Sequence, residues 1–248
     1  MPCLLVEGRT VKCGLVIFDK NGTLVDQNMV LLALAKARRS SFKNHAGEDS
    51  AALWERLVGV NLKNDEIDQG GPLGTAPRRE EILIASAALY LNQHSWSEAK
   101  QLAQKIYDEA DESMTPPYGS VFLSGVEEAL SRLKRGGLKL AIASTDTHRR
   151  TVESFKALGV AKLFDVVVGS DDVVNGKPSP DMILQILKET GVSADDAVMV
   201  GDSASDMQMG RNVKVQACIG VLTGFTSAEK LGQLADIVVS SVAELRTA

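Results

Sequence analysis

The sequence predicts an α/β fold, in which a parallel sheet is flanked by helices and an all-helical segment follows the first core strand. Short apolar runs alternate with amphipathic helical patterns from about residue 120 to the C-terminal end. One more apolar run, at 14–18, stands near the N-terminus, and residues 26–115 carry helical spacing only. We therefore expect a core domain formed by 1–25 and 116–248 and a helical domain formed by 26–115.

The N-terminal residues predict a β-hairpin that leads into the core sheet. Residues 3–7 and 11–18 are both strand-like, and the turn formers Gly8-Arg9-Thr10 separate them. We expect the second arm of this hairpin to become the first core strand.

The segment that follows has the apolar spacing of helices and no strand pattern. Helices are expected at 29–39, 51–58, 78–91 and 97–110. Ser95 and Glu98 have the spacing of a capping box before the last helix. The glycine-containing stretch 61–77 predicts an irregular loop.

Beyond residue 115 the chain predicts alternating helices and strands. Ser124 and Glu127 are expected to cap the first helix, which ends at Gly136. The elements expected after it are strand 138–143, helix 151–158, strand 164–168, helix 181–189, strand 197–200, helix 207–212 and strand 215–219. These apolar runs are continuous, as is typical of strands buried on both faces.

Composition and charge favour a small-molecule partner. The 248 residues are 44% hydrophobic and 24% charged, with a net charge of −5. A negative charge disfavours nucleic acid or an anionic membrane as the main partner. Cys3, Cys13 and Cys218 lack the spacing of a metal site or a disulfide framework, so we expect reduced thiols. No apolar run is long enough to span a bilayer, and we expect a cytoplasmic protein.

Polar residues follow several of the expected parallel strands and would share one edge of the sheet. Asp19 follows the first core strand, Ser144 and Thr145 follow the second, and Asp202 follows the strand at 197–200. Lys177 joins them from a Gly-Lys-Pro turn. Each residue alone is also typical of a helix cap or a solvated turn.

Taken together, these side chains have the chemistry of a phosphate and divalent-cation site. Asp19 has the chemistry of a nucleophile or metal ligand, and with Asp202 it offers the oxygen ligands that Mg²⁺ prefers. Ser144 can donate a hydrogen bond to a phosphate oxygen, and Lys177 can supply positive charge. Asp206 has two open interpretations: a further metal ligand, or an acidic residue at a helix N-terminus.

Four motifs in order resemble those of the haloacid dehalogenase superfamily, in particular its phosphatases with a helical cap of the C1 type. They are Asp-Lys-Asn-Gly-Thr-Leu at 19–24, Ser144 after its strand, Lys177 in Gly-Lys-Pro-Ser-Pro-Asp, and Gly-Asp-Ser-Ala-Ser-Asp at 201–206. The C-terminal run 220–224 is similar to that of phosphoglycolate phosphatases.

The resemblance implies a Rossmann-like core and a Mg²⁺-dependent phosphatase. Asp19 would attack phosphorus to form an aspartyl-phosphate, and Mg²⁺ would be held by Asp19, Asp202 and the backbone carbonyl of Asn21. Ser144, Thr145 and Lys177 would bind the transferring group. The backbone N–H groups of Gly22 and Thr23 would bind the same oxygens.

The cap would recognise the substrate, a small phosphate monoester. The irregular segment 61–79 is our candidate for contact. Its Arg78 favours an anionic substrate, because arginine pairs with carboxylates through two hydrogen bonds. The alternative is a solvated loop in which Arg78 is a capping charge.

Asn21 departs from the family pattern, which has an acid–base aspartate at this position. An amide has no proton to transfer at neutral pH, and losing such help typically lowers the rate by ~10²- to 10⁴-fold. Three explanations are open: an engineered variant that traps a complex, a natural enzyme whose leaving group needs no proton, such as an acyl phosphate, or a slow or inactive member.

Other functions would use a site of this kind differently. A non-catalytic phosphate sensor would use the same pocket. A phosphonatase would need a Schiff-base lysine in the cap, for which Lys36, Lys43 and Lys63 are available. Asp202 argues against a dehalogenase, which has no need of the metal-binding carboxylates.

Overall fold

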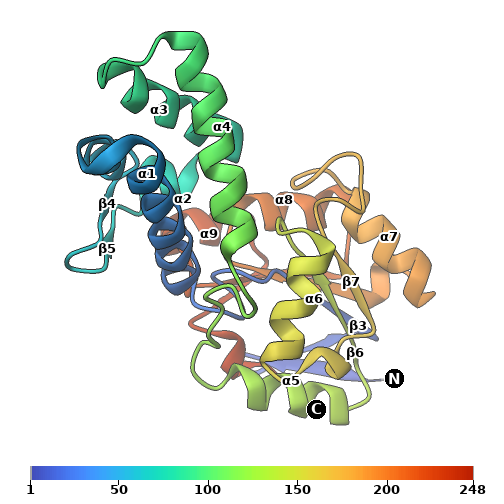
Figure 1. Cartoon of the computed structure of the whole chain (residues 1–248). Helices are drawn as coiled ribbons and strands as arrows, with labels where there is room; N and C mark the ends of the chain where they lie inside the picture. Colours follow the sequence, from blue (N-terminus) through green and yellow to red (C-terminus); the bar gives the residue numbers. More distant parts are fainter. Residues whose placement is uncertain (1, 248) are drawn as a thin grey trace. The chain divides into compact units, whose positions relative to one another are not determined.

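The computed structural model describes residues 2–247, and the chain forms two compact units (Figure 1). One unit consists of the residues up to Gln27 together with those from Ser120 onward, and the other is Asn28–Gly119. No helix within 2–247 is both long enough and apolar enough to cross a membrane.

The first unit contains a six-stranded sheet in which all neighbouring strands are parallel. The strand order is β10-β9-β8-β3-β6-β7. Their bounds are β3 Leu15–Phe18, β6 Lys139–Ala143, β7 Val166–Val168, β8 Ala197–Gly201, β9 Ala217–Val221 and β10 Ile237–Val239. The predicted α/β fold is therefore confirmed. Because β3 lies between β6 and β8, the three strand ends that carry the predicted site residues are adjacent.

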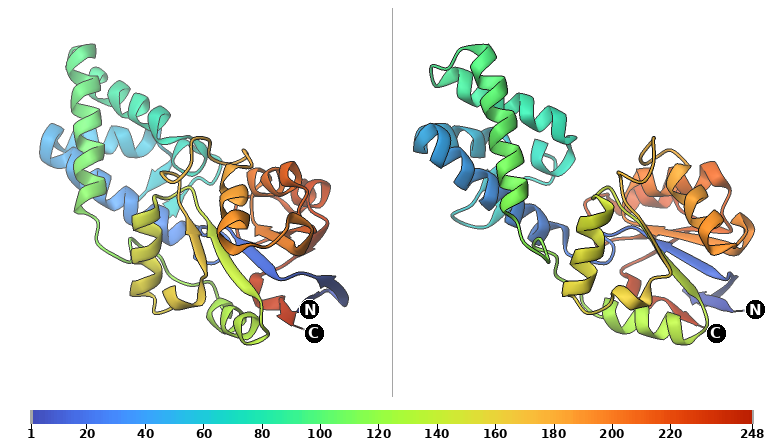
Figure 2. Two further views of the ribbon diagram at one scale, coloured as in Figure 1. Left: turned by 90° about the vertical axis from the view of Figure 1, so that its right-hand side faces the viewer. Right: turned by 45° about the vertical axis from the view of Figure 1, so that its right-hand side comes forward.

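Helices cover both faces of this sheet. An apolar cluster joins Ile17 and Met199 to residues of α7, α8 and α9, so these three helices pack on one face. Figure 2 shows them in orange and red, with α5 in green on the other side of the sheet. The bounds are α5 Val126–Arg135, α6 His148–Ala157, α7 Asp181–Thr190, α8 Ala204–Val213 and α9 Ala228–Leu234, with short 3₁₀ turns η1 Ala161–Leu163, η2 Ala194–Asp196 and η3 Val242–Glu244.

The N-terminal hairpin is confirmed, but its second arm does not continue into the core. Strands β1 (Cys3–Val6) and β2 (Arg9–Lys12) form a small antiparallel sheet with β11 (Arg246–Thr247). Gly14 then donates its backbone N–H to the carbonyl of Asp196 at 2.8 Å. A Cβ at Gly14 would lie 2.7 Å from an Asp196 carboxylate oxygen, so glycine permits this change of sheet.

The second unit is built mainly from three long helices, α1 (Gln27–Leu57), α3 (Arg78–Leu91) and α4 (Trp96–Ser113). Their buried apolar residues form one cluster, in which Trp54 stacks on Phe42 and donates its Nε1–H to the hydroxyl of Tyr107 at 3.0 Å. The capping box of Ser95 and Glu98 is confirmed.

The two helices expected at 29–39 and 51–58 lie within α1 on either side of a kink at Gly47, where φ is 80°. Two other expectations about this segment are wrong. The helical segment also contains a strand pair, β4 (Val60–Asn61) with β5 (Glu66–Ile67). The loop expected at 61–77 contains this pair and the short helix α2 (Pro72–Thr75).

The predicted N-cap of the first core helix is also wrong. Helix α5 follows Gly125, which has a left-handed backbone and makes no side-chain capping bond. Because glycine adopts this conformation without steric penalty, the chain turns into the helix one residue after Ser124. Helix α9 and strand β10 were not anticipated.

Candidate active site

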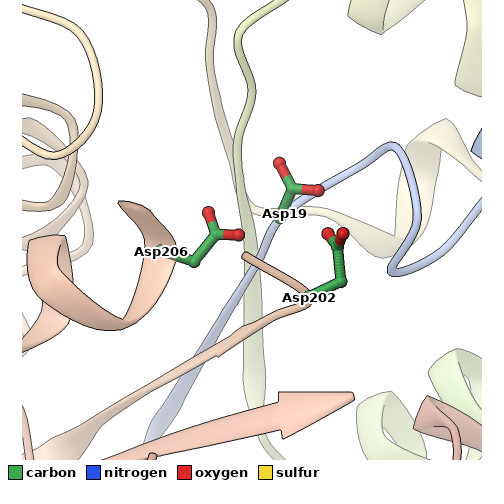
Figure 3. Close-up of side chains that lie close together, drawn as sticks. All are labelled: Asp19, Asp202 and Asp206. Atoms are coloured by element: carbon green, nitrogen blue, oxygen red, sulfur yellow. The ribbon is translucent and has the colours of Figure 1, made fainter. Parts of the chain in front are cut away.

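Three carboxylates meet at the carboxyl edge of the core sheet. Asp19 follows β3, and its backbone N–H donates to the carbonyl of Val200 at 2.9 Å, which extends the pairing with β8. Asp202 follows β8, and Asp206 lies in the first turn of α8. All three are buried, and each offers an oxygen within 4.8 Å of the others. Figure 3 shows the three side chains gathered at the end of β3.

Lys177 links two of these carboxylates. Its Nζ lies 2.5 Å from Asp19 Oδ1 and 2.7 Å from Asp206 Oδ1, and its side chain is only 3% exposed. The loop between β7 and α7 supplies this lysine. The structure thus brings Lys177 to Asp19 from 158 positions away in the chain.

Asp206 takes the helix N-terminal role that the sequence offered, and it also lies beside Asp19 and Asp202. Its Oδ2 accepts hydrogen bonds from the backbone N–H and the hydroxyl of Ser203, while its own N–H donates to the Ser203 hydroxyl. This is a capping box at the start of α8. The other oxygen, Oδ1, accepts from Lys177, so a single side chain caps the helix and belongs to the acidic cluster.

Two glycines allow the chain to close around Asp202. Gly22 has a φ of +83°, and a Cβ there would lie 2.7 Å from Asp202 Oδ2. A Cβ at Gly224 would overlap the same oxygen. Thr23 donates its hydroxyl to Asp202 Oδ1 at 3.2 Å, and Thr223 donates to the carbonyl of Gly22 at 2.6 Å. Two loops therefore fix the position of the Asp202 carboxylate.

The backbone N–H of Gly22 is already used inside its loop. It donates to the carbonyl of Val25 at 2.8 Å, so in this geometry it does not offer itself to a ligand. Thr223 and Gly224 were not among the predicted site residues, although they belong to the run 220–224 that the sequence singled out.

Burial and mutual repulsion shift the pKa values in the cluster. Burial, with the charges of Asp19 and Asp206, raises the pKa of Asp202 to about 8. Burial also raises the pKa of Asp19 to about 6, although Lys177 opposes that rise. For Lys177, burial disfavours the ammonium, but Asp19 and Asp206 hold its pKa above the usual value. Three carboxylates around one ammonium leave the site short of positive charge.

The donor set of this cluster fits Mg²⁺. The three side chains offer only carboxylate oxygens, which are the hard ligands this ion prefers. Burial and then the neighbouring carboxylates raise the pKa of Asp202, and a divalent cation would oppose both effects by stabilising the ionised carboxylates.

A second polar group lies at the end of β6. Ser144 is buried, its N–H donates to the carbonyl of Val168, and its hydroxyl accepts from the backbone N–H of Asp146 at 3.1 Å. Thr145 beside it is exposed. The Asp146 carboxylate accepts a hydrogen bond from Lys20 Nζ at 2.7 Å.

The ion pair of Lys20 and Asp146 was missed in the sequence. Lys20 is 1% exposed and also donates to the hydroxyl of Ser154 at 3.2 Å. Burial opposes the charge on Asp146, but Lys20 holds the pKa of that carboxyl below its usual value. The available signal was a lysine two residues after a fully apolar strand.

The side chain of Asn21 contacts the ion pair of Lys20 and Asp146. Its Nδ2 donates to Asp146 Oδ2 at 3.5 Å. Its Oδ1 is buried and has no hydrogen-bond partner among the described residues.

Arg78 belongs to the helical unit, where its guanidinium is paired. It lies 2.7 Å from Asp108 Oδ1 and 3.1 Å from Asp111 Oδ2, both on α4. Its part in substrate recognition stays a prediction. The candidate Schiff-base lysines Lys36, Lys43 and Lys63 are all exposed, which does not favour the desolvated amine that such chemistry uses.

Comparison with known proteins identifies the family. The sequence model of the family described as haloacid dehalogenase-like hydrolase matches residues 78–220, which are 143 of the 248 residues. A phosphoglycolate phosphatase of Escherichia coli strain K12 is 27% identical over 243 residues, covering 93% of this chain and 90% of that protein. A pyrophosphatase, PpaX, of Halalkalibacterium halodurans is 27% identical over 210 residues, covering 82% and 81%.

Solved structures agree on the fold. A haloacid dehalogenase superfamily hydrolase of subfamily IA from Geobacter sulfurreducens has a TM-score of 0.61 at 20% identity, with 94% of this chain and 95% of that chain covered. Because the family model spans more than half of the sequence, the chain belongs to the haloacid dehalogenase-like hydrolases.

Proposed function

We propose that the chain is a Mg²⁺-dependent phosphatase that passes a phosphoryl group from a small phosphate compound to Asp19 and then to water. The observation that carries the proposal is the position of Asp19 at the end of β3, in contact with Lys177 and beside Asp202 and Asp206. A nucleophile, a cation and an oxygen-only metal site at one sheet edge are the parts that phosphoryl transfer uses.

Each side chain has a distinct part in the proposed reaction. Asp19 supplies the carboxylate oxygen that bonds to phosphorus. Lys177 keeps Asp19 ionised and neutralises the oxygens of the transferring group, to which Ser144 donates a hydrogen bond. Asp19, Asp202 and the backbone carbonyl of Asn21 would hold Mg²⁺, with Asp206 beside them, and the bound ion would supply charge neutralisation at the phosphoryl oxygens.

We assign substrate recognition to the helical unit Asn28–Gly119, acting as a cap. Arg78, Thr145 and the backbone of Thr23 are the further binding groups in this proposal. An anionic substrate agrees with the arginine in the cap and with the name of the similar phosphoglycolate phosphatase. The similar pyrophosphatase extends the range of compounds worth testing to anhydrides.

A panel assay tests the proposal against the alternative of a phosphate sensor. Phosphate release is measured for a range of phosphate esters and anhydrides with Mg²⁺, with a chelator, and with the Asp19→Asn variant. We expect release that depends on Mg²⁺ and is lost in Asp19→Asn. Binding of phosphate compounds without release of phosphate would support the sensor.

A further inference from the structure

We propose that the site acts on phosphate compounds whose leaving group departs as a stable anion, namely acyl phosphates and phosphoanhydrides. This inference rests on the proposed phosphatase function and narrows its substrate class. It follows from the way in which Lys20 and Asp146 hold the amide of Asn21.

The surroundings of Asn21 suit an amide and fix its orientation. Lys20 is fully buried, and its ammonium donates to Asp146 and Ser154. The Asp146 carboxylate can only accept hydrogen bonds while it is paired in this way, so the atom of Asn21 that faces it must be a donor. The observed contact is Asn21 Nδ2 to Asp146 Oδ2 at 3.5 Å. A carboxylate at position 21 would place two negative oxygens against one lysine.

With its nitrogen committed to Asp146, Asn21 offers only an acceptor. Its Oδ1 is buried without a partner among residues 2–247. An unpaired buried acceptor costs free energy, which a hydrogen bond from water or from a substrate hydroxyl would recover. An amide oxygen can orient a water molecule, as glutamine does in GTPases, but it gives no proton. Neither Asn21 nor the committed Lys20 therefore supplies a proton to a leaving oxygen.

The proposed reaction balances without a general acid. In the first step a carboxylate oxygen of Asp19 bonds to phosphorus, the bond from phosphorus to the leaving oxygen breaks, and its electron pair leaves with that oxygen as an anion. In the second step the oxygen of water bonds to phosphorus and the bond to Asp19 breaks, which returns the electron pair to the carboxylate. The second proton of the water passes to a phosphoryl oxygen, so the product is dihydrogen phosphate.

The stability of the departing anion then controls the rate. The conjugate acid of a carboxylate leaving group has a pKa of about 4, and that of a phenol about 10. An alcohol resembles water, at about 16. Because neither Asn21 nor Lys20 protonates the leaving oxygen, we expect alkyl monoesters to lose the ~10²- to 10⁴-fold that general acid catalysis usually provides.

The test compares leaving groups in the native protein and in Asn21→Asp. kcat/KM with Mg²⁺ is measured for acetyl phosphate, pyrophosphate, a series of substituted aryl phosphates and a small alkyl phosphate. We expect the native rate to fall steeply as leaving-group pKa rises. In Asn21→Asp the alkyl phosphate should gain ~10²-fold or more, while acetyl phosphate changes by less than about tenfold. Asn44→Asp, an exposed position on α1, is the matched charge control and should leave the slope unchanged.

A second variant keeps the test valid if Asn21→Asp alone is too unstable to assay. The double exchange Asn21→Asp with Asp146→Asn keeps one carboxylate and one amide in contact beside Lys20. It should fold like the native protein and show the shallow leaving-group dependence.

The possible results separate the inference from the proposed function. Equal native rates on acetyl and alkyl phosphates, or an unchanged slope in both variants that carry the Asn21→Asp exchange, would overturn the inference and leave the phosphatase function standing. Absence of Mg²⁺-dependent turnover for every compound in the native protein and in both variants would overturn the proposed function itself.

Discussion

Replacing Lys177 with methionine would remove an ammonium that contacts two members of the acidic cluster. The change deletes contacts of 2.5 and 2.7 Å to Asp19 and Asp206 from a side chain that is 3% exposed. Removing one partner from a buried ion pair typically destabilises a protein by about 3–5 kcal/mol. We take about 3 kcal/mol for Lys177→Met, because the remaining carboxyl groups can take up protons.

The loss of stability in Lys177→Met should increase as the pH rises. Burial already places the pKa of Asp19 at about 6 in the folded protein, against an ordinary value of 3.8, and without Lys177 it rises further. A carboxyl group whose pKa is raised by folding does not lower the free energy of unfolding while the pH is below its pKa in the unfolded chain. The free energy of unfolding then falls as the pH rises toward the pKa of that group in the folded protein. Lys177→Met should therefore be only slightly destabilised near pH 4 and fully destabilised near pH 8.

Urea unfolding measures this effect directly. With a slope of about 3 kcal/mol per molar urea, a loss of about 3 kcal/mol lowers the midpoint by about 1 M at pH 8 without metal. Lys156→Met, an exposed position on α6, is the matched control and should unfold like the native protein. A Lys177→Met midpoint equal to the native one at pH 8, or a shift that does not change with pH, would show that Lys177 does not stabilise the ionised carboxylates.

Three further predictions concern the metal site and the helical unit. Mg²⁺ should raise the Tm more at pH 8 than at pH 6, because the pKa of Asp202 is about 8 and protons compete with the metal below it; calorimetry at both pH values checks this, and an equal shift would count against it. Gly224→Ala should weaken Mg²⁺ binding ~10-fold, because the added Cβ would displace the Asp202 carboxylate. Titration calorimetry measures this affinity, and an unchanged value would contradict the prediction. Arg78→Ala should lower stability by no more than about 1 kcal/mol, because its ion pairs are partly exposed, and should leave hydrolysis of a small aryl phosphate unchanged; a loss of that hydrolysis would contradict it.

The sequence predicted the core well because its signals are local. Continuous apolar runs such as Leu15–Phe18 identified strands that the structure buries completely. Since parallel strands end at one edge, Asp19 and Asp202 were expected to meet, and the structure brings them within a common cluster. The two-residue strands β4 and β5 are too short to show any periodicity, so the sequence could not predict them.

The missed contacts depend on residues far apart in the chain. Lys20 looks like a solvated lysine in the sequence, and its burial becomes understandable only with Asp146, 126 positions away. The orientation of the Asn21 amide has the same origin. The sequence alone does not tell whether the neighbours of residue 21 can pair with an amide. In the structure they do, because the Asp146 carboxylate accepts a hydrogen bond from the Asn21 amide.

Mass spectrometry can identify the residue that carries the phosphoryl group during turnover. The native protein is mixed with acetyl phosphate and Mg²⁺, quenched with acid within one turnover and analysed by mass spectrometry after digestion. We predict one phosphoryl group on the peptide that contains Asp19, at that residue, and none in Asp19→Asn. A phosphoryl group on another residue, or turnover by Asp19→Asn at the native rate, would show that Asp19 is not the nucleophile.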